Sequence, residues 1–273
     1  MCGVENKRIW RHGIAIVVLL IAVISRNPVE GWAVLMETND YPEGYDDLPV
    51  DFVDIERMQT MLQSHGWSTH HILVRKDGIT PETIKEGVEF LKGNADRNDI
   101  VVFYIASHGG YLRHDLKWNN TFPPLWEEIE TPKRLLIVDS CFAASFLPES
   151  DRSLISIASV SEKESGWAGV PEEGLPIEGF VFTYYFCESM TGQVSVEEGF
   201  STCVPQVQKY MKEVVYPEFK DVYPAEHYYN IYDPHPVMVD QYPGAFHLEV
   251  KQKAPLSVFL VFMGMLLALR RKR

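Results

Sequence analysis

The feature that most constrains the fold is a repeated alternation between short continuous apolar runs and stretches with helical periodicity. The runs at 32–36 (WAVLM), 100–105 (IVVFYI) and 135–138 (LLIV) are typical of strands buried on both faces. Between them, residues 51–62 and 80–91 place apolar side chains three and four positions apart, as on one face of a helix. This order predicts an α/β fold in which helices cover both faces of a mostly parallel sheet.

The remaining segments complete this arrangement. We expect a short strand at 71–75, a fifth core strand at 154–160 and a helix near 180–190. Residues 214–250 are rich in Tyr, Pro and His, and we expect them to form an ordered segment that wraps around the domain.

Both ends of the chain combine an apolar run with cations. The run at 14–24 follows Lys7, Arg8 and Arg11, a pattern typical of a signal peptide or an uncleaved signal anchor. The run at 256–269 is closed by four cations, which predicts a membrane anchor with a cytoplasmic tail. We therefore expect three parts: a signal segment at 1–26, a catalytic domain at 27–250 outside the cytoplasm (at the cell surface or in a lumen), and an anchor at 251–273.

The charge balance argues against a nucleic-acid binder. The formal net charge is −13, and all but one of the 38 acidic residues lie between the two basic ends. Four cysteines are too few for a disulfide scaffold. Cys187 and Cys203 lie in the predicted exported part, where they could form a disulfide or remain two buried thiols.

The residues that follow two of the predicted strands point to covalent catalysis. The strand at 100–105 runs into Ala106-Ser107-His108-Gly109-Gly110, and the strand at 135–138 runs into Asp139-Ser140-Cys141. Carboxyl ends of neighbouring parallel strands meet at one edge of a sheet, where catalytic groups gather. A histidine beside a cysteine can accept the thiol proton and return a proton to a leaving amine. The glycines allow backbone N–H groups to approach a developing oxyanion.

These segments resemble the caspase-like cysteine peptidases of clan CD. YIASHGG (104–110) and LLIVDSCFAAS (135–145) resemble the His-Gly block and the strand-x-Cys block of that clan, and ISIASVSEKESG (155–166) resembles its fifth-strand segment. GWAVLM (31–36) and YDPHPVMVD (232–240) are more similar to legumains and to the catalytic subunit of the GPI transamidase. Metacaspases share the Asp-Ser-Cys triplet. The resemblance covers about residues 31–240.

The resemblance implies a three-layer caspase-like sandwich and an endopeptidase that acts on proteins or peptides. It implies that His108 is the general base and acid, that Cys141 is the nucleophile, and that the amides of Gly109 and Cys141 form the oxyanion hole. Clan members need no third catalytic residue. Some belong to multi-subunit assemblies, which leaves partner subunits open here.

The resemblance also suggests what the substrate pocket selects. In this clan the residue two before the cysteine, here Asp139, lines the pocket, and LPVDFVDIERM (48–58) resembles the metacaspase segment that supplies a second acid, here Asp54. Two carboxylates would favour Arg or Lys before the scissile bond. Asp54 could equally be a solvated acid in the first turn of a helix. No Arg lies between Met36 and Glu56, where legumains supply a basic residue, and this weakens an Asn preference.

Two other functions remain open at this stage. A transpeptidase of the GPI-transamidase or legumain type would resolve the same thioester with an amine, and an inactive relative would act as a scaffold. We expect no cofactor, although the acidic loop that holds Asp40, Glu43, Asp46 and Asp47 could bind calcium, as in some metacaspases. The adjacent His70 and His71, which we expect to alternate on a strand, do not suggest a zinc site.

Overall fold

The computed structural model describes residues 28–48, 50–149, 154–170, 174–224 and 230–250. Residues Glu30–Lys251 form one compact unit. The predicted signal segment and the predicted C-terminal anchor both lie outside the described residues. Within the described ranges, no helix combines the length and the apolar character that a bilayer crossing requires.

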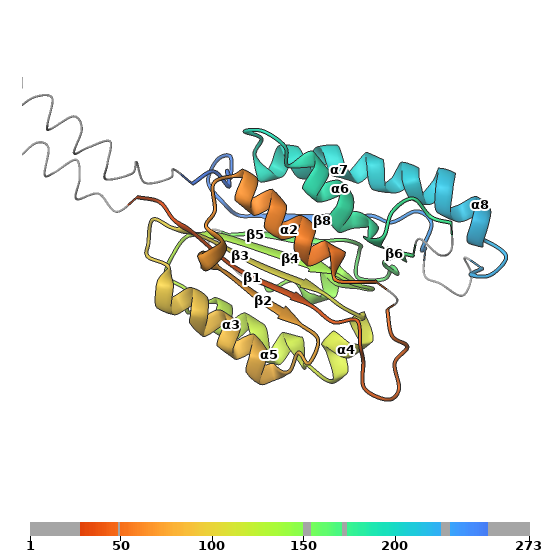
Figure 1. Ribbon diagram of the computed structural model, residues 1–273, viewed down its shortest axis with the longest axis horizontal. Helices are drawn as coiled ribbons and strands as arrows, with labels where there is room; N and C mark the ends of the chain where they lie inside the picture. The colour runs from red at the N-terminus through yellow and green to blue at the C-terminus, as the bar shows by residue number, and fades with distance from the viewer. Residues whose placement is uncertain (1–27, 49, 150–153, 171–173, 225–229, 251–273) are drawn as a thin grey trace, which may run out of the picture. The chain divides into compact units, whose positions relative to one another are not determined.

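A six-stranded sheet forms the centre of this unit, with the strand order β2-β1-β3-β4-β5-β8 (Figure 1). The pairs among the first five strands are parallel, and β8 pairs antiparallel with β5 at one edge. The strands are β1 (Gly31–Glu37), β2 (Ile72–Lys76), β3 (Ile100–Ala106), β4 (Lys133–Asp139), β5 (Ile155–Ala158) and β8 (Val237–Asp240).

Helices cover both faces of the sheet, which confirms the predicted α/β architecture (Figure 1). One face carries α3 (Pro81–Asn94), α4 (Gly109–His114) and α5 (Trp118–Trp126). The other face carries α2 (Val53–Ser64), α6 (Val181–Ser189) and α7 (Val196–Tyr210). Short elements complete the chain: η1 (Thr69–His71), η2 (Ala143–Phe146), β6 (Ala168–Gly169), β7 (Gly179–Phe180), the π-helical turn η4 (Met211–Val215) and α8 (Tyr216–Phe219).

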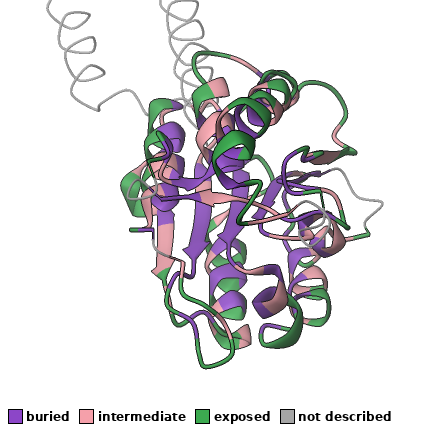
Figure 2. Ribbon diagram, turned by 90° about the vertical axis from the view of Figure 1, so that its right-hand side faces the viewer, coloured by how far each residue is buried: buried purple, intermediate pink, exposed green. Residues whose placement is uncertain are grey.

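The sequence patterns behind these elements are local and physical. Every residue of β3 is buried, as a continuous apolar run in a central parallel strand requires (Figure 2). In α2 the predicted apolar face, Ile55, Met58 and Leu62, is buried. The helix α3 begins at a capping box in which the Thr80 hydroxyl accepts from the amide of Thr83.

Several predictions need correction at this level. His70 and His71 lie in the 3₁₀ turn η1 and not on a strand, and the His71 ring stacks on Trp32 with centroids 3.8 Å apart. The strand predicted at 154–160 spans only Ile155–Ala158. Cys187 and Cys203 are both free thiols and both buried, so the disulfide alternative is not what the structure contains.

The segment after residue 190 holds elements that the sequence patterns did not reveal. The helix α7 was not predicted because Pro205 stands inside it and Gly199 packs on its apolar face against Met190, which obscures the helical repeat. The segment predicted at 214–250 to wrap around the domain contributes β8 to the sheet itself, as the antiparallel partner of β5.

Candidate active site

The pairing of β3 with β4 brings the two predicted catalytic residues to one edge of the sheet. The register aligns Ala106 with Asp139, and the amide of Ser107 donates to the Asp139 carbonyl at 3.1 Å. His108 therefore follows the carboxyl end of β3, and Cys141 follows the carboxyl end of the adjacent parallel strand β4. A side chain at Gly109 would overlap the carbonyl of Cys141 and lie 3.4 Å from its Cβ. Only glycine allows this close approach of the two loops.

Hydrogen bonds from the loop after β1 fix the orientation of His108. Its backbone N–H donates to the Tyr41 hydroxyl at 2.9 Å, and its Nε2 lies 2.8 Å from the carbonyl oxygen of Asp46. A carbonyl oxygen only accepts hydrogen bonds, so Nε2 carries the proton and Nδ1 keeps the lone pair. The ring nitrogen left for proton transfer is therefore Nδ1.

Aromatic rings hold the imidazole from the side. The Tyr41 ring lies 4.6 Å from the His108 ring between centroids, and the Tyr45 ring stacks on it at 6.3 Å and 20°. The Tyr41 hydroxyl donates to Thr38 O at 2.5 Å, and the Tyr45 hydroxyl donates to Asp115 at 2.6 Å. Sequence reasoning missed both tyrosines, because a Tyr in a polar loop has no pattern that distinguishes it from a surface residue.

Cys141 is partly exposed at the start of the loop after β4. Burial raises the pKa of its thiol, and the negative charge of Asp139 adds to this, although hydrogen bonds from the Gly166 amide and the Ser165 side chain oppose both effects. Because its pKa is raised, the resting cysteine is a thiol that needs a base to become a nucleophile. The next residue, Phe142, has φ 60° and donates its amide to Glu164 O at 2.7 Å.

A pocket lies near the loop after β4, and Asp139 forms part of its wall, although neither His108 nor Cys141 is among the described residues that line it. Gly166, which also lines this pocket, approaches Ser140 and Cys141 so closely that an added Cβ would lie 3.1 Å from Ser140 O and 3.4 Å from Cys141 N. The described residues that line the pocket are Asp139, Ser159, Val160, Ser165, Gly166, Trp167, Val181, Phe182, Val207, Met211, Ile231 and Pro234.

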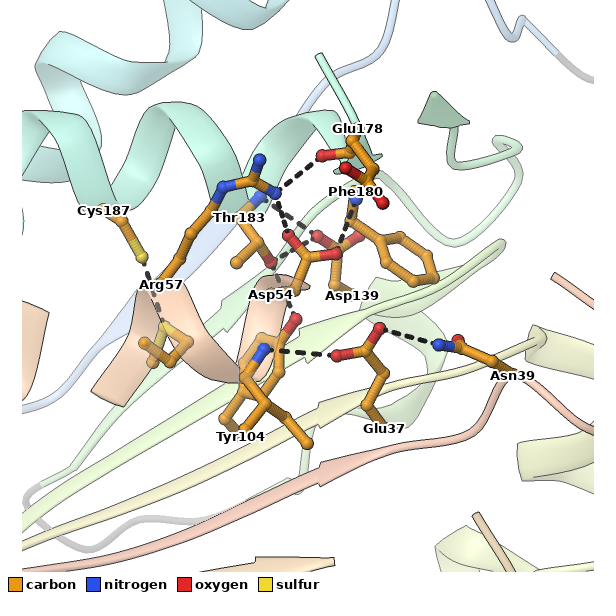
Figure 3. Close-up of polar contacts among 12 residues, drawn as sticks. Glu37, Asn39, Asp54, Arg57, Tyr104, Asp139, Glu178, Phe180, Thr183 and Cys187 are labelled. Atoms are coloured by element: carbon orange, nitrogen blue, oxygen red, sulfur yellow. Dashed lines mark hydrogen bonds and ion pairs between the residues drawn. The ribbon is translucent and has the colours of Figure 1, made fainter. Parts of the chain in front are cut away.

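Asp139 is held by neutral donors only. The amide of Thr183 donates to its carboxylate at 3.2 Å and the Thr183 hydroxyl donates at 2.8 Å (Figure 3). Burial raises the pKa of Asp139 to about 7, although hydrogen bonds from Ser159 and Thr183 lower it in part. No cation among the described residues contacts this carboxylate in a salt bridge.

Asp54 has different partners and does not line the pocket among the described residues. Arg57 Nη1 lies 2.9 Å from Asp54 Oδ1, and the amide of Phe180 donates to Oδ2 at 2.7 Å (Figure 3). The same Arg57 nitrogen donates to Glu178 O at 2.6 Å, and the guanidinium lies over the Tyr184 ring. Burial raises the pKa of Asp54 to about 6, and the Phe180 amide and Arg57 oppose this. Asp54 is therefore fully buried and is not the solvated helix acid considered above.

A third buried carboxylate, Glu37 at the end of β1, was missed by sequence reasoning. Its oxygens accept from Asn39 Nδ2 and from the Ile55 amide, each at 3.2 Å (Figure 3). Burial and the neighbouring Asp54 raise its pKa to about 8, so it is largely protonated at neutral pH. The available signal was its position, since an acid that directly follows a continuous apolar strand reaches the functional edge of the sheet.

The acidic loop has structural roles in the described residues. The Asp47 carboxylate accepts from the Tyr41 amide at 2.8 Å, and the contribution of Asp46 to the site is its backbone carbonyl. Across the described part of the chain, no group of three or more His, Cys, Asp or Glu side chains is arranged to hold a metal ion. The predicted calcium alternative therefore gains no support from this loop.

The central sheet with helices on both faces defines the class of fold, a three-layer α/β sandwich. Comparison with known proteins gives the family. A profile of the caspase domain (peptidase C14) matches residues 30–221, so the chain belongs to the caspase-domain family, whose members are cysteine peptidases.

The solved structures agree with this fold. Caspase-1 from Spodoptera frugiperda superimposes with a TM-score of 0.55 at 12% sequence identity, over 83% of this chain and 92% of that chain. No curated protein sequence matches the chain. The closer likeness to legumains, the GPI transamidase subunit or metacaspases remains a prediction from the sequence.

Proposed function

We propose that the protein is a cysteine endopeptidase in which Cys141 attacks the peptide carbonyl and His108 moves the protons. The observation that carries this proposal is the contact of the two loops, where the backbone of Gly109 lies against the backbone of Cys141. We infer from this contact that His108 can act as the base and Cys141 as the nucleophile, since they follow neighbouring strand ends and Gly166, which approaches Cys141, lines a pocket.

The hydrogen bonding of His108 suits its proposed role in proton transfer. Because Nε2 of His108 is committed to Asp46 O, the unprotonated Nδ1 accepts the Cys141 proton as sulfur bonds to the carbonyl carbon. The amides of Gly109 and Cys141 donate to the oxyanion that forms. His108 then protonates the leaving amine, and water hydrolyses the thioester to release the acid and restore the thiol.

We further propose that the pocket favours Arg or Lys before the scissile bond, with Asp139 as the residue that binds the cation. Hydroxyl and amide donors hold Asp139 without a cation from the described residues, whereas Arg57 already compensates Asp54. An approaching substrate cation would also favour the ionised form of Asp139. Asp54 then contributes by holding the loop before α6 through the Phe180 amide.

We also propose that the run at 14–24 directs the catalytic domain out of the cytoplasm, as a signal peptide or signal anchor, and that the run at 256–269 anchors it in the membrane. Carbonate-resistant membrane pelleting of the full-length chain, with the catalytic domain protease-sensitive only from the extracytoplasmic side, would support this. Recovery in the soluble fraction would contradict it.

The proposed reaction needs no metal, because the cysteine supplies the nucleophile and the histidine transfers the protons, so EDTA should leave cleavage unchanged.

The test is a peptide-library cleavage profile with the full-length chain. We expect cleavage after Arg and Lys, and loss of at least about a thousandfold in rate in Cys141→Ala. Cleavage that persists in Cys141→Ala would overturn the mechanism, and cleavage after Asn or Asp would overturn the pocket assignment. Hydroxylamine added to the assay tests the transpeptidase alternative, because an amine-resolved thioester yields hydroxamate in place of the free acid.

A further inference from the structure

Two segments that are far apart in the sequence form one side of the pocket. We call residues 161–167 the pocket loop and residues 230–235 the strap. The pocket loop contributes Ser165, Gly166 and Trp167 to the lining, and the strap contributes Ile231 and Pro234. The strap leads directly into β8, which pairs with β5. The pocket therefore depends on how the strap and the pocket loop are held together.

The Glu164 side chain makes that connection. Its Oε1 accepts from His235 Nδ1 at 2.7 Å and from Asn230 Nδ2 at 2.8 Å. Its Oε2 accepts from the His235 amide at 2.8 Å and from the Ser161 amide at 3.1 Å. One carboxylate thus joins three donors of the strap to one donor of the pocket loop.

The burial of Glu164 makes these bonds consequential. Its side chain is only 9% exposed, whereas that of His235 is 56% exposed. Burial alone would raise the pKa of Glu164, but the hydrogen bonds from His235, Asn230 and Ser161 outweigh it and hold that pKa below its ordinary value. The same bond raises the pKa of His235. A charge-assisted pair of this kind is stronger than a neutral hydrogen bond, and an unpaired buried carboxylate is costly.

The backbone of Glu164 reaches the nucleophile. Glu164 O accepts the amide of Phe142, the residue after Cys141, at 2.7 Å. The pocket loop also supplies the Ser165 and Gly166 donors to the Cys141 thiol. A shift of Glu164 would consequently move the pocket wall beside the reacting sulfur.

We propose that Glu164, His235 and Asn230 form a latch that positions the pocket wall for substrate binding. These are positioning residues, because they act through the pocket loop and the strap. This inference rests on the proposed peptidase function. The latch should affect substrate affinity more than the chemical step, since His108 and the Gly109 contact belong to other segments.

The test compares His235→Leu with His235→Asn in the full-length chain. Leu removes the side-chain donor, and the short Asn amide can replace Nδ1 as a donor to Glu164. We expect KM for an Arg peptide to rise about tenfold in His235→Leu and less than threefold in His235→Asn, with kcat within threefold of wild type in both. Asn230→Gly, which keeps the left-handed backbone (φ 54°) but removes the other donor, should also raise KM several-fold.

His247→Leu is the matched control. His247 is 48% exposed and its Nδ1 lies 3.8 Å from Glu249, so the control removes an exposed histidine beside an acid outside the latch. Equal KM values in wild type and His235→Leu, or equal losses in the Leu and Asn variants, would overturn the latch.

Hydrogen exchange separates failure of the latch from failure of the proposed function. In His235→Leu we expect faster amide exchange in peptides that cover residues 161–167, with β3 unchanged. This readout does not depend on activity, so it holds even if wild type cleaves no peptide. Unchanged exchange in the pocket loop would contradict the latch, whereas inactive wild type with altered exchange would contradict only the peptidase assignment.

Discussion

Asp54 and Asp139 are two buried carboxylates on the same side of the sheet, and they differ in what holds them. Asp54 begins α2 and is paired with Arg57, a cation from its own helix. Asp139 ends β4 and is held by the amide and hydroxyl of Thr183 (Figure 3). Both are almost inaccessible to solvent, at 0% and 1% exposure.

The difference separates a carboxylate that stabilises the fold from one that can bind a ligand. A buried charge must be paired or hydrogen-bonded, and Arg57 satisfies Asp54 within the chain. Thr183 satisfies the hydrogen-bonding capacity of Asp139 without cancelling its charge. The two aspartates therefore differ in the partners that the fold gives them, which the sequence alone does not show, and four predictions test this difference.

The largest effect should follow from Asp139→Asn. We expect kcat/KM for a peptide with Arg before the scissile bond to fall about a hundredfold, because the substrate cation loses the carboxylate that we propose binds it. Cleavage of the matched citrulline peptide should change less than threefold, which serves as the internal control. Equal losses on both peptides would mean that Asp139 supports the structure and does not select the substrate.

Asp54→Asn should instead act on stability. We expect the free energy of unfolding to fall by about 2 kcal/mol, because Arg57 loses its partner and the Phe180 amide keeps a weaker acceptor. The ratio of Arg to citrulline cleavage should stay within threefold of wild type. Denaturant titration and the two-peptide assay give both values, and a collapse of the ratio with stability intact would reverse the division between the two acids.

The pH dependence of selectivity should report the ionisation of Asp139. With a pKa of about 7, its charge increases as pH rises from 6 to 8, while a substrate Arg stays protonated. The ratio of kcat/KM for Arg to that for citrulline should therefore rise about tenfold across this range. The ionisation of His108 and Cys141 affects cleavage of both peptides equally, so it cancels in this ratio. A ratio independent of pH, or one that falls as pH rises, would be inconsistent with Asp139 as the cation-binding group.

Arg57→Lys should give the smallest effect. Lysine can still pair with Asp54, and a single nitrogen makes both the Asp54 and the Glu178 O contacts of Arg57, but lysine loses the planar guanidinium that lies over the Tyr184 ring. We expect a loss of about 1 kcal/mol, seen as a drop of a few degrees in the unfolding midpoint, with peptide selectivity unchanged. A change in selectivity here would show that Arg57 contacts substrate.

The sequence predicted the parts of the site that depend on strand order. Continuous apolar runs identify β1, β3 and β4, and the second residue after β3 is His108 and the second after β4 is Cys141. Because parallel neighbours share an edge, these two residues could be placed together from the sequence alone. The helical faces of α2 and α3 follow from spacing in the same way.

The contacts between distant segments could not be predicted. Arg57 lies about one helical turn after Asp54, and only the geometry of α2 shows that its guanidinium reaches back to that carboxylate. The carbonyl of Asp46 and the ring of Tyr41 reach His108 through a loop whose path no periodicity specifies. The pairing of β8 with β5, and with it the strap, depends on a crossover that local propensity does not encode.

The most direct test of the central claim is covalent labelling of the full-length chain with a peptidyl electrophile that ends in Arg, followed by peptide mass spectrometry. We predict one adduct, on Cys141, that is lost in Cys141→Ala and strongly reduced in His108→Ala and Asp139→Asn. The buried Cys187 and Cys203 should remain unlabelled. An adduct on another cysteine, or labelling of Cys141 by an Asn or Asp probe but not by the Arg probe, would contradict it.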